Sequence, residues 1–211
     1  MKPLTECRLY AFVDTAYLNG RAPEFIAQKL CDGGADLIQL RAKNSSPEEI
    51  RLMAEAILPI TMRCNVGLVI NDHLSVARHV GAELCHLGQE DFFAQGHTHV
   101  STIRVHGSPQ IGLSTHSPEQ ARKAIAAGAD YIANGPVYAT GTKPSAKPVT
   151  LDYIRWAAAN VTVPWFAIGG INLNNIHEVL AAGAQQICVV SAILNSDDID
   201  QTCRKFKNRL S

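Results

Sequence analysis

The segment Gly34-Ala-Asp-Leu-Ile-Gln-Leu-Arg-Ala-Lys43 contains a complete junction between a helix and a strand. Gly34 suits the left-handed backbone conformation that ends a helix. Leu37–Leu40 is short and mostly apolar, which is typical of a strand covered on both faces in a parallel sheet. Polar and charged side chains mark its end. The segment therefore predicts a buried strand whose carboxyl end carries functional groups.

The same junction recurs along the chain. Gly81-Ala-Glu83, Gly128-Ala-Asp130 and Gly183-Ala-Gln185 each precede an apolar run, and the first three glycines of the series are 47 residues apart, which fits two strand-helix units. Eight apolar runs are predicted as strands: Leu9–Val13, Leu37–Leu40, Gly67–Ile70, Leu84–Leu87, Gln110–Leu113, Tyr131–Asn134, Val163–Ile168 and Gln186–Val190.

Amphipathic segments separate these strands. The clearest predicted helices are Ser46–Arg63, Pro118–Ala127, Leu173–Ala182 and Asp198–Leu210. Ser46 and Ser117, each followed by proline, are predicted N-caps. Eight alternating units indicate the α/β class and a (β/α)8 TIM barrel, formed as a single domain over residues 1–211. An open doubly wound sheet is the alternative, but the chain lacks the G-x-G-x-x-G turn that would support dinucleotide binding.

The composition restricts the class of partner. Nineteen basic residues balance nineteen acidic ones among the 211 residues, and neither sign forms a long block, so we expect no general affinity for nucleic acid or membrane. No apolar stretch approaches the length of a membrane span, and we expect a cytoplasmic protein. The six scattered cysteines, with no C-x-x-C pair, indicate reduced thiols, several in the core, rather than a disulfide or zinc framework. The oligomeric state stays open, and a homo-oligomer is compatible with the sequence.

The carboxyl ends of parallel strands meet at one rim of a barrel, so the polar groups there should converge. Gln39, Arg41 and Lys43 alternate in an extended run and should leave on one side together. A guanidinium and an ammonium held in that way suit a diphosphate. The alternative is that they are solvated loop charges.

Two carboxylates follow neighbouring strands. Asp72 comes after Asn71 at the end of one strand, and Asp91 follows the next. Carboxylates supplemented by phosphate oxygens and water suit Mg²⁺. The alternative is that Asn71 and Asp72 cap a helix beginning near Leu74.

Two further loops carry candidate groups. Thr140-Gly-Thr142-Lys143-Pro144 lies in a long Gly-, Pro-, Ser- and Thr-rich connection, which is typical of an active-site loop, with a surface turn as the alternative. Gly169-Gly170 and Val190-Ser191 follow the last two strands, where barrels often bind phosphate through backbone N–H groups; packing glycines are the alternative. His116 is either a base or a residue that orients its loop.

In this order, the motifs resemble the thiamin phosphate synthase family over nearly the whole chain. The resemblance rests on Leu9-Tyr10, Gln39–Lys43, Ile70–Asp72, His86–Asp91, Gly112–His116, Gly135-Pro136, Thr140–Lys143, Ala167–Ile171 and Val190-Ser191. The chain departs from the family pattern at His73, at Cys85, at Ala133-Asn134 and in a longer Phe92–Pro109 segment. Of these, Asn134 would alter the floor of the pocket.

The resemblance implies an enzyme that joins 4-amino-5-hydroxymethyl-2-methylpyrimidine diphosphate to a thiazole phosphate, plain or carboxylated, and releases pyrophosphate. It implies that Arg41, Lys43 and Lys143 are catalytic. The pyrimidine diphosphate would be held by Gln39, Arg41, Lys43, Asn71, Ser114 and Lys143. Thr140, Thr142, Gly170, Val190 and Ser191 would receive the thiazole phosphate, and Asp72 and Asp91 would bind Mg²⁺.

As the resemblance implies, the pyrimidine C–O bond breaks largely before the thiazole nitrogen attacks. The protein must then stabilise the departing negative charge and shield a benzylic-type cation, and no protein nucleophile is needed. Two other functions stay open. A thiazole tautomerase would need a proton-transfer residue, such as His116, but not the joint set of cations and carboxylates. A non-catalytic phosphate-binding barrel would not need the metal residues.

Overall fold

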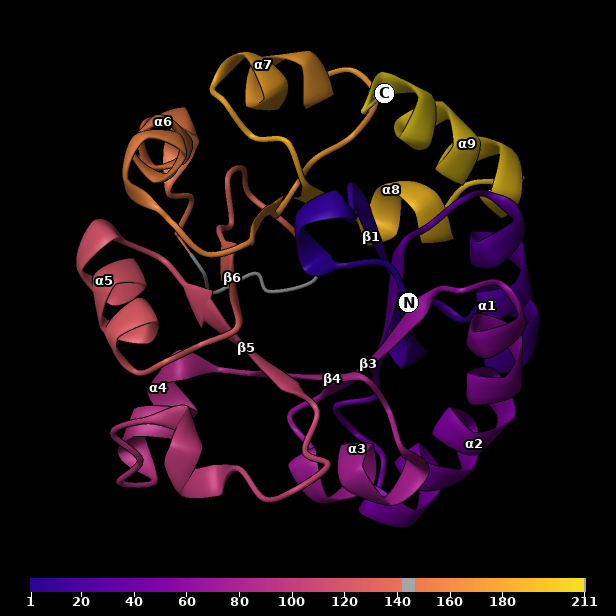
Figure 1. Cartoon of the computed structure of the whole chain (residues 1–211). Helices are drawn as coiled ribbons and strands as arrows, with labels where there is room; N and C mark the ends of the chain where they lie inside the picture. The colour runs from indigo at the N-terminus through magenta and orange to yellow at the C-terminus, as the bar shows by residue number, and fades with distance from the viewer. Residues whose placement is uncertain (142–146, 211) are drawn as a thin grey trace.

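The computed structural model describes residues 1–141 and 147–210, and in this part the chain forms a closed barrel of eight parallel strands (Figure 1). Each strand pairs with the next in the sequence, and the last pairs with the first. The predicted (β/α)8 barrel is confirmed. The strands are β1 Leu9–Asp14, β2 Leu37–Arg41, β3 Gly67–Asn71, β4 Leu84–Leu87, β5 Gln110–Thr115, β6 Tyr131–Asn134, β7 Trp165–Ile168 and β8 Ile187–Cys188.

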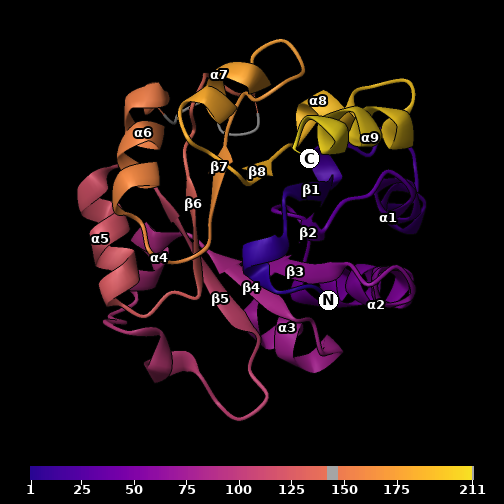
Figure 2. The same cartoon turned by 45° about the horizontal axis from the view of Figure 1, so that its top comes forward.

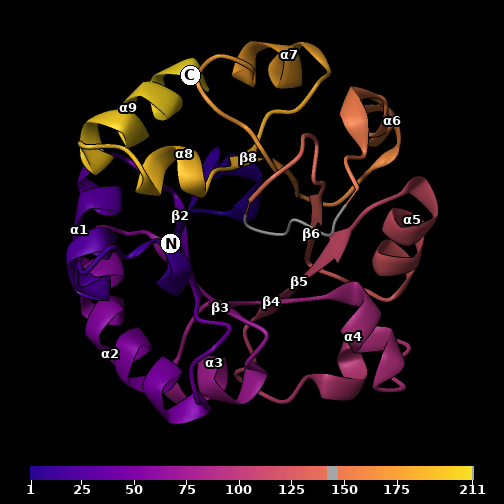
Figure 3. The same cartoon turned by 180° about the vertical axis from the view of Figure 1, so that it is seen from behind.

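Helices form an outer ring around the strands, as the views from the two ends of the barrel show (Figures 1 and 3). In the described part of the chain, the short 3-10 helices are η1 Leu4–Glu6, η2 Thr15–Tyr17 and η3 Val100–Ile103. The α-helices are α1 Pro23–Asp32, α2 Pro47–Arg63, α3 Leu74–Val80, α4 Gln89–Ala94, α5 Pro118–Ala126, α6 Thr150–Asn160, α7 Ile176–Ala181, α8 Ser191–Leu194 and α9 Ile199–Arg209. Within residues 1–141 and 147–210, no helix combines the length and apolarity that crossing a bilayer requires.

The predicted N-caps and helix-ending glycines are present in the structure. Ser46 caps α2 and forms a reciprocal capping box with Glu49, and the Ser117 side chain accepts the Gln120 N–H at the start of α5. All four glycines of the recurring junction have positive φ, between 73° at Gly81 and 99° at Gly183. The left-handed backbone thus ends each helix just before its strand.

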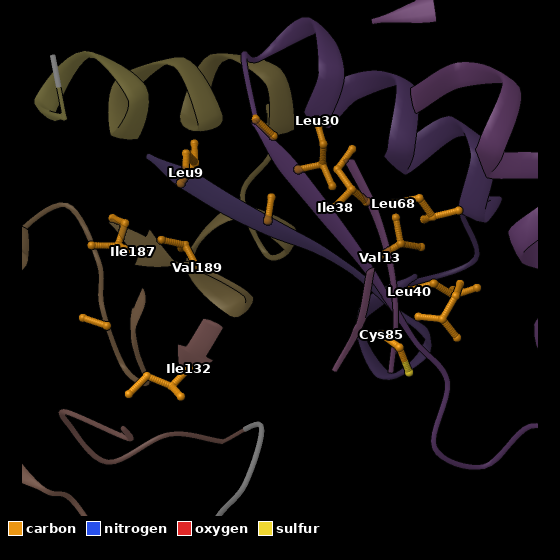
Figure 4. Close-up of a cluster of buried hydrophobic side chains, with 14 of the residues drawn as sticks. Leu9, Val13, Leu30, Ile38, Leu40, Leu68, Cys85, Ile132, Ile187 and Val189 are labelled. Carbon is orange, nitrogen blue, oxygen red and sulfur yellow. The ribbon is translucent and has the colours of Figure 1, made fainter. Parts of the chain in front are cut away.

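Strand residues alternate between two apolar layers, which explains why the strands read as nearly continuous apolar runs. Residues such as Leu9 and Val13 face outward and pack with Leu30 of α1 in the layer between barrel and helices (Figure 4). The inward layer is rich in aromatic rings, and η1 covers it at the amino-terminal end of the barrel. It contains Leu4, Cys7, Tyr10, Phe12, Leu37, Val69, Leu84, Tyr131, Phe166 and Cys188.

Two predicted elements are shorter than expected by three or more residues. β8 spans Ile187–Cys188 instead of Gln186–Val190. Just before it, the Gln186 side chain donates to the Leu4 and Cys7 carbonyls of the N-terminal segment. α7 begins at Ile176 rather than Leu173. There the side chains of Asn172 and Asn175 bond to backbone N–H groups of the preceding turn, and such local bonds compete with helix formation.

The six cysteines are all free thiols, as expected from their spacing. Four of them, Cys7, Cys85, Cys188 and Cys203, are buried, and burial raises the pKa of the Cys7 and Cys85 thiols to about 11 and about 12. They therefore act as apolar packing groups.

Candidate functional site

A pocket of about 410 Å³ opens at the carboxyl ends of the strands. The predicted site residues that line it are Gln39, Arg41, Lys43, Asn71, Asp72, Asp91, Ser114, Thr140, Gly170, Val190 and Ser191. Thr142 and Lys143 lie outside the described residues. Residues from seven different strands or their following loops thus meet at one rim, as the parallel topology requires.

The two cations after β2 differ in how they are held. Arg41 donates to the Asp14 carboxylate at 2.7 Å, and its side chain is 17% exposed. Lys43 is 54% exposed and lies 3.5 Å from the Asp72 carboxylate. The alternative of a solvated loop charge is therefore wrong for Arg41, which is anchored within the rim.

Beneath these cations, a hydrogen-bonded chain crosses the barrel interior. Gln39 donates to the Tyr10 hydroxyl, which lies 3.4 Å from the Tyr131 hydroxyl, and that hydroxyl lies 3.3 Å from His86 Nδ1. Burial lowers the pKa of His86 to about 4, although Asp72 opposes this shift. The imidazole is therefore neutral at physiological pH, and Nδ1 can accept from Tyr131.

Tyr10 and Phe12 stack on one another with ring centroids 5.3 Å apart, and Phe166 meets the Tyr10 ring edge-on at the same distance. Tyr10 and Phe12 also line the pocket, so its floor is aromatic. Sequence reasoning did not assign these rings to the site. The signal was present in the alternation of β1, which places both residues on the inward face with Gln39 of the neighbouring strand.

Asp72 and Asp91 lie on adjacent strand ends. The Asp72 N–H donates to the His86 carbonyl of β4, and Asp91 stands in the first turn of α4, just beyond the same strand. Both side chains are exposed and line the pocket. Within residues 1–141 and 147–210, no three His, Cys, Asp or Glu side chains gather closely enough to hold a metal ion by themselves. Asp72 and Asp91 thus reach the same pocket, where Glu90 is a further lining carboxylate.

The capping alternative for Asn71 and Asp72 is wrong. The N-cap of α3 is His73, and it makes no capping side-chain bond. The Asn71 amide instead donates to the Asp72 carboxylate at 2.6 Å. Asp72 has a φ of 64°, an uncommon left-handed conformation that non-glycine residues adopt most readily as Asn or Asp. Both side chains are thereby directed to the pocket rim instead of the helix.

The loop after β7 combines a pocket face with tight packing. Gly169 and Gly170 have φ of 103° and 66°. A Cβ on Gly170 would lie 2.7 Å from the Tyr138 Cβ and 2.8 Å from the Ala139 carbonyl oxygen. The packing alternative is thus correct in part, although Gly170 also lines the pocket beside Ser191, the first residue of α8.

His116 joins two loops of the rim. Its Nδ1 donates to the Gly135 carbonyl, and its Nε2 lies 3.9 Å from the Glu90 carboxylate. Ser114, two residues earlier, accepts the Gln89 N–H at 3.4 Å. His116 therefore links the loops after β4, β5 and β6, and it also lines the pocket.

Asn134 does not line the pocket. It is fully buried on the outward face of β6, where its Oδ1 accepts from the Thr115 hydroxyl, which in turn contacts the Tyr153 hydroxyl of α6. The expectation that Asn134 alters the pocket floor is wrong, because strand alternation directs Ala133 inward and Asn134 toward the helices.

The fold and site define a (β/α)8 barrel with a small-molecule pocket lined by cations and carboxylates at the carboxyl ends of its strands. The family model described as thiamine monophosphate synthase matches residues 9–193. The chain belongs to this family, and it is a transferase of thiamine biosynthesis.

Individual relatives agree with this assignment. The chain is 37% identical to the thiamine-phosphate synthase of Halalkalibacterium halodurans, over 98% of this chain and 97% of the relative. It is 40% identical to the thiamine-phosphate synthase of Thermus thermophilus, over 84% of each chain. The solved structure of thiamine phosphate pyrophosphorylase from Pyrococcus furiosus superposes with a TM-score of 0.86, at 28% identity, over 98% of this chain and 96% of that one.

Proposed function

We propose that the protein couples 4-amino-5-hydroxymethyl-2-methylpyrimidine diphosphate with 4-methyl-5-(2-phosphoethyl)thiazole, or its carboxylated form, to give thiamine phosphate and pyrophosphate, with CO2 as a further product when the thiazole is carboxylated. The observation that carries the proposal is the joint lining of one pocket by Arg41, Lys43, Asp72 and Asp91. A diphosphate needs both the cations and a metal-binding carboxylate pair, whereas a phosphate sensor or a tautomerase does not.

The pyrimidine diphosphate is assigned to the side of the pocket formed by β2, β3 and β5. Arg41 and Lys43, together with Lys143, take the diphosphate oxygens and act as the catalytic cations. Gln39, Asn71 and Ser114 complete this side. The aromatic floor below it is suited to a flat ring.

The thiazole phosphate is assigned to the loops after β6, β7 and β8. Thr140 and Thr142 supply hydroxyl donors, and Gly170, Val190 and Ser191 supply backbone and hydroxyl groups around the phosphate. Thr140, Gly170, Val190 and Ser191 line the same pocket as Arg41, which supports a geometry in which the two substrates meet.

Asp72 and Asp91 fit a magnesium ion. Both carboxylates are exposed to the pocket, and Asp91 lies over Gly88, where a Cβ would come within 2.9 Å of its Oδ2. Two carboxylates with room left for phosphate oxygens and water match the preference of Mg²⁺. The chemistry that a bound Mg²⁺ supplies is neutralisation of charge on the phosphate oxygens.

The residues of the chain provide the rest of the mechanism. Arg41 and Lys43 stabilise the negative charge that develops as the C–O bond breaks, which is most effective when the donors are already in place. Tyr10 and Phe12 shield the resulting pyrimidine cation from water until the thiazole nitrogen attacks. The reaction needs no protein nucleophile, because the leaving pyrophosphate and the attacking nitrogen both belong to the substrates.

The test is to incubate purified protein with both substrates and Mg²⁺, to measure pyrophosphate release and to determine the product mass. We expect joined rings and stoichiometric pyrophosphate, with loss of both when either substrate is omitted. A rearranged thiazole would instead establish a tautomerase. Thiazole phosphate binding by calorimetry without coupling would establish a binding protein, and either result would overturn the proposal.

A further inference from the structure

Asp14, the last residue of β1, is a buried carboxylate at the same rim as the pocket. It is 1% exposed, and both of its oxygens have partners. Oδ1 accepts the Ala16 N–H at 3.0 Å and opens η2, and Oδ2 accepts from the Arg41 guanidinium at 2.7 Å. Burying a carboxylate is costly unless it is paired, so its position beside Arg41 requires an explanation.

The barrel register creates this pair. β1 and β2 run parallel with Asp14 directly opposite Arg41, so the two side chains emerge from adjacent strand ends. A planar guanidinium has five N–H donors in a fixed fork. The bond to Asp14 engages one nitrogen and leaves the other donors of the fork available at the pocket, which Arg41 lines.

Electrostatics alone would disfavour a carboxylate at this position. Asp14 offsets one positive charge in a site that has to receive a diphosphate, and its pairing with Arg41 therefore weakens the long-range attraction for that anion. The gain is in geometry, because a cation that is already oriented loses less conformational freedom when the anion binds. Lys43 shows the contrast, since its more exposed ammonium lies 3.5 Å from its nearest carboxylate.

We propose that Asp14 is a positioning residue that fixes the Arg41 guanidinium for the diphosphate of the substrate. The inference rests on the proposed function for the identity of that anion. Asp14 acts through Arg41 and does not itself touch the substrate. Its removal therefore affects the diphosphate side of the reaction and leaves the thiazole phosphate side unchanged.

The experiment uses two substitutions that separate positioning from local structure. Asp14→Asn keeps the shape of the side chain and removes its charge. Asp14→Ser keeps an acceptor for the Ala16 N–H but is too short to reach Arg41. For each we would measure kcat, the KM of both substrates, the Kd of inorganic pyrophosphate with Mg²⁺ by calorimetry, and Tm. The control is Asp152→Asn, which breaks an Asp-Arg pair of the same 2.7 Å length on the exposed surface of α6.

We expect both Asp14 variants to lose about tenfold in kcat/KM for the pyrimidine diphosphate, in the range of couplings between contacting residues. Pyrophosphate binding should weaken by a similar factor, and the KM of the thiazole phosphate should not change. In an Arg41→Gln background, Asp14→Asn should cause no further loss. The surface control should match the unmodified protein in all constants.

Two results would overturn the proposal. One is a lower Tm with unchanged kinetic constants per folded molecule, which would make Asp14 structural only. The other is a loss of equal size in the Arg41→Gln background, which would make Asp14 independent of Arg41. The unmodified protein is assayed first: absence of coupling there contradicts the proposed function, whereas the pyrophosphate titration still tests the Asp14–Arg41 relation.

Discussion

At the scale of single residues, the surroundings separate side chains that look alike in the sequence. Arg41 and Lys43 are both cations after β2, but only Arg41 is held by a buried carboxylate. Asp91 and Glu90 are neighbouring carboxylates that both line the pocket, yet Glu90 lies beside His116. A substitution at one of two neighbouring residues of the same charge can therefore be compared with the same kind of substitution at the other.

The first prediction concerns the loop lysine. Lys143→Ala should lower kcat by about 10² or more, because one charge-stabilising donor is lost. Lys147→Ala is the control in the same connection and should keep nearly normal turnover. Steady-state pyrophosphate release measures both variants, and normal turnover in Lys143→Ala would remove its catalytic assignment.

The second prediction concerns the metal. Asp91→Asn should shift the Mg²⁺ dependence of diphosphate binding to higher concentration, since a neutral amide is a weaker ligand for a hard cation. Glu90→Gln serves as the control, with its titration expected to follow that of the unmodified protein. Calorimetric titrations at several Mg²⁺ concentrations give the comparison. An unaltered curve for Asp91→Asn would show that Asp91 is not a ligand.

The third prediction concerns His86 and pH. Burial lowers the pKa of this imidazole from 6.5 to about 4. Between these values the unfolded chain binds a proton that the folded chain does not, so the contribution is fully present above pH 6.5 and is lost as the pH falls toward 4. Urea unfolding at pH 7, 6 and 5 should therefore show that the free energy of unfolding falls less with decreasing pH in His86→Gln than in the unmodified protein. A decline in His86→Gln equal to that of the unmodified protein would refute the prediction.

At the scale of elements, the loop after β7 places two structural requirements on Gly170, one on its backbone conformation and one on the space around its Cα. Gly170 needs a positive φ and has no space for a Cβ, whereas Gly20 has a positive φ of 79° with no atom within 4 Å of the added carbon. The pair therefore separates backbone strain from steric overlap.

The fourth prediction follows from that pair. Gly20→Ala should cost roughly 1 kcal/mol from left-handed backbone strain alone. Gly170→Ala should cost about 1–3 kcal/mol more, because the new methyl group overlaps Tyr138 and Ala139. Denaturant unfolding gives both values. Equal costs would mean that the Tyr138 loop moves aside without penalty.

At the scale of the whole molecule, one buried carboxylate connects both ends of the chain. Asp36 accepts from Lys2 at 2.8 Å, from Lys207 of α9, and from the N–H groups of Arg8 and Leu9. These contacts hold the N-terminal segment and the last helix to the barrel near the start of β2 (Figure 2). Burial by itself raises the pKa of Asp36, but the hydrogen bonds from Lys2 and Lys207 lower it overall.

The fifth prediction tests this connection. Asp36→Asn should destabilise the protein by about 3 kcal/mol, because an amide NH2 at the buried position cannot accept the Arg8 and Leu9 N–H groups, and the partly exposed Lys2 and Lys207 lose their counter-charge. Asp32→Asn, an exposed neighbour at the end of α1, should change stability by no more than about 0.5 kcal/mol. Since its folded pKa is lowered, the Asp36 contribution is present at neutral pH and is lost as the pH falls below 3.8. Chemical unfolding at pH 7 and pH 3 checks both statements, and a stability equal to that of Asp32→Asn would contradict them.

The sequence by itself determined the barrel, the eight strands to within two residues at either end, and the family. Those features depend on local patterns: apolar runs of strand length, serine caps such as Ser46, and glycines such as Gly81 that end helices. The polar groups at strand ends were also predictable, because parallel strands bring them to one rim whatever the details of packing.

Only the tertiary structure decided which of those groups are anchored. The Asp14–Arg41 bond joins residues 27 apart, and the Asp36–Lys207 bond joins residues 171 apart. The bond from the Gln186 side chain to the Leu4 carbonyl likewise joins residues 182 apart. Burial, ion pairing and the lowered pKa of His86 arise from contacts between distant segments, and a local sequence pattern contains no information about the dielectric surroundings or partners that folding will bring to a side chain.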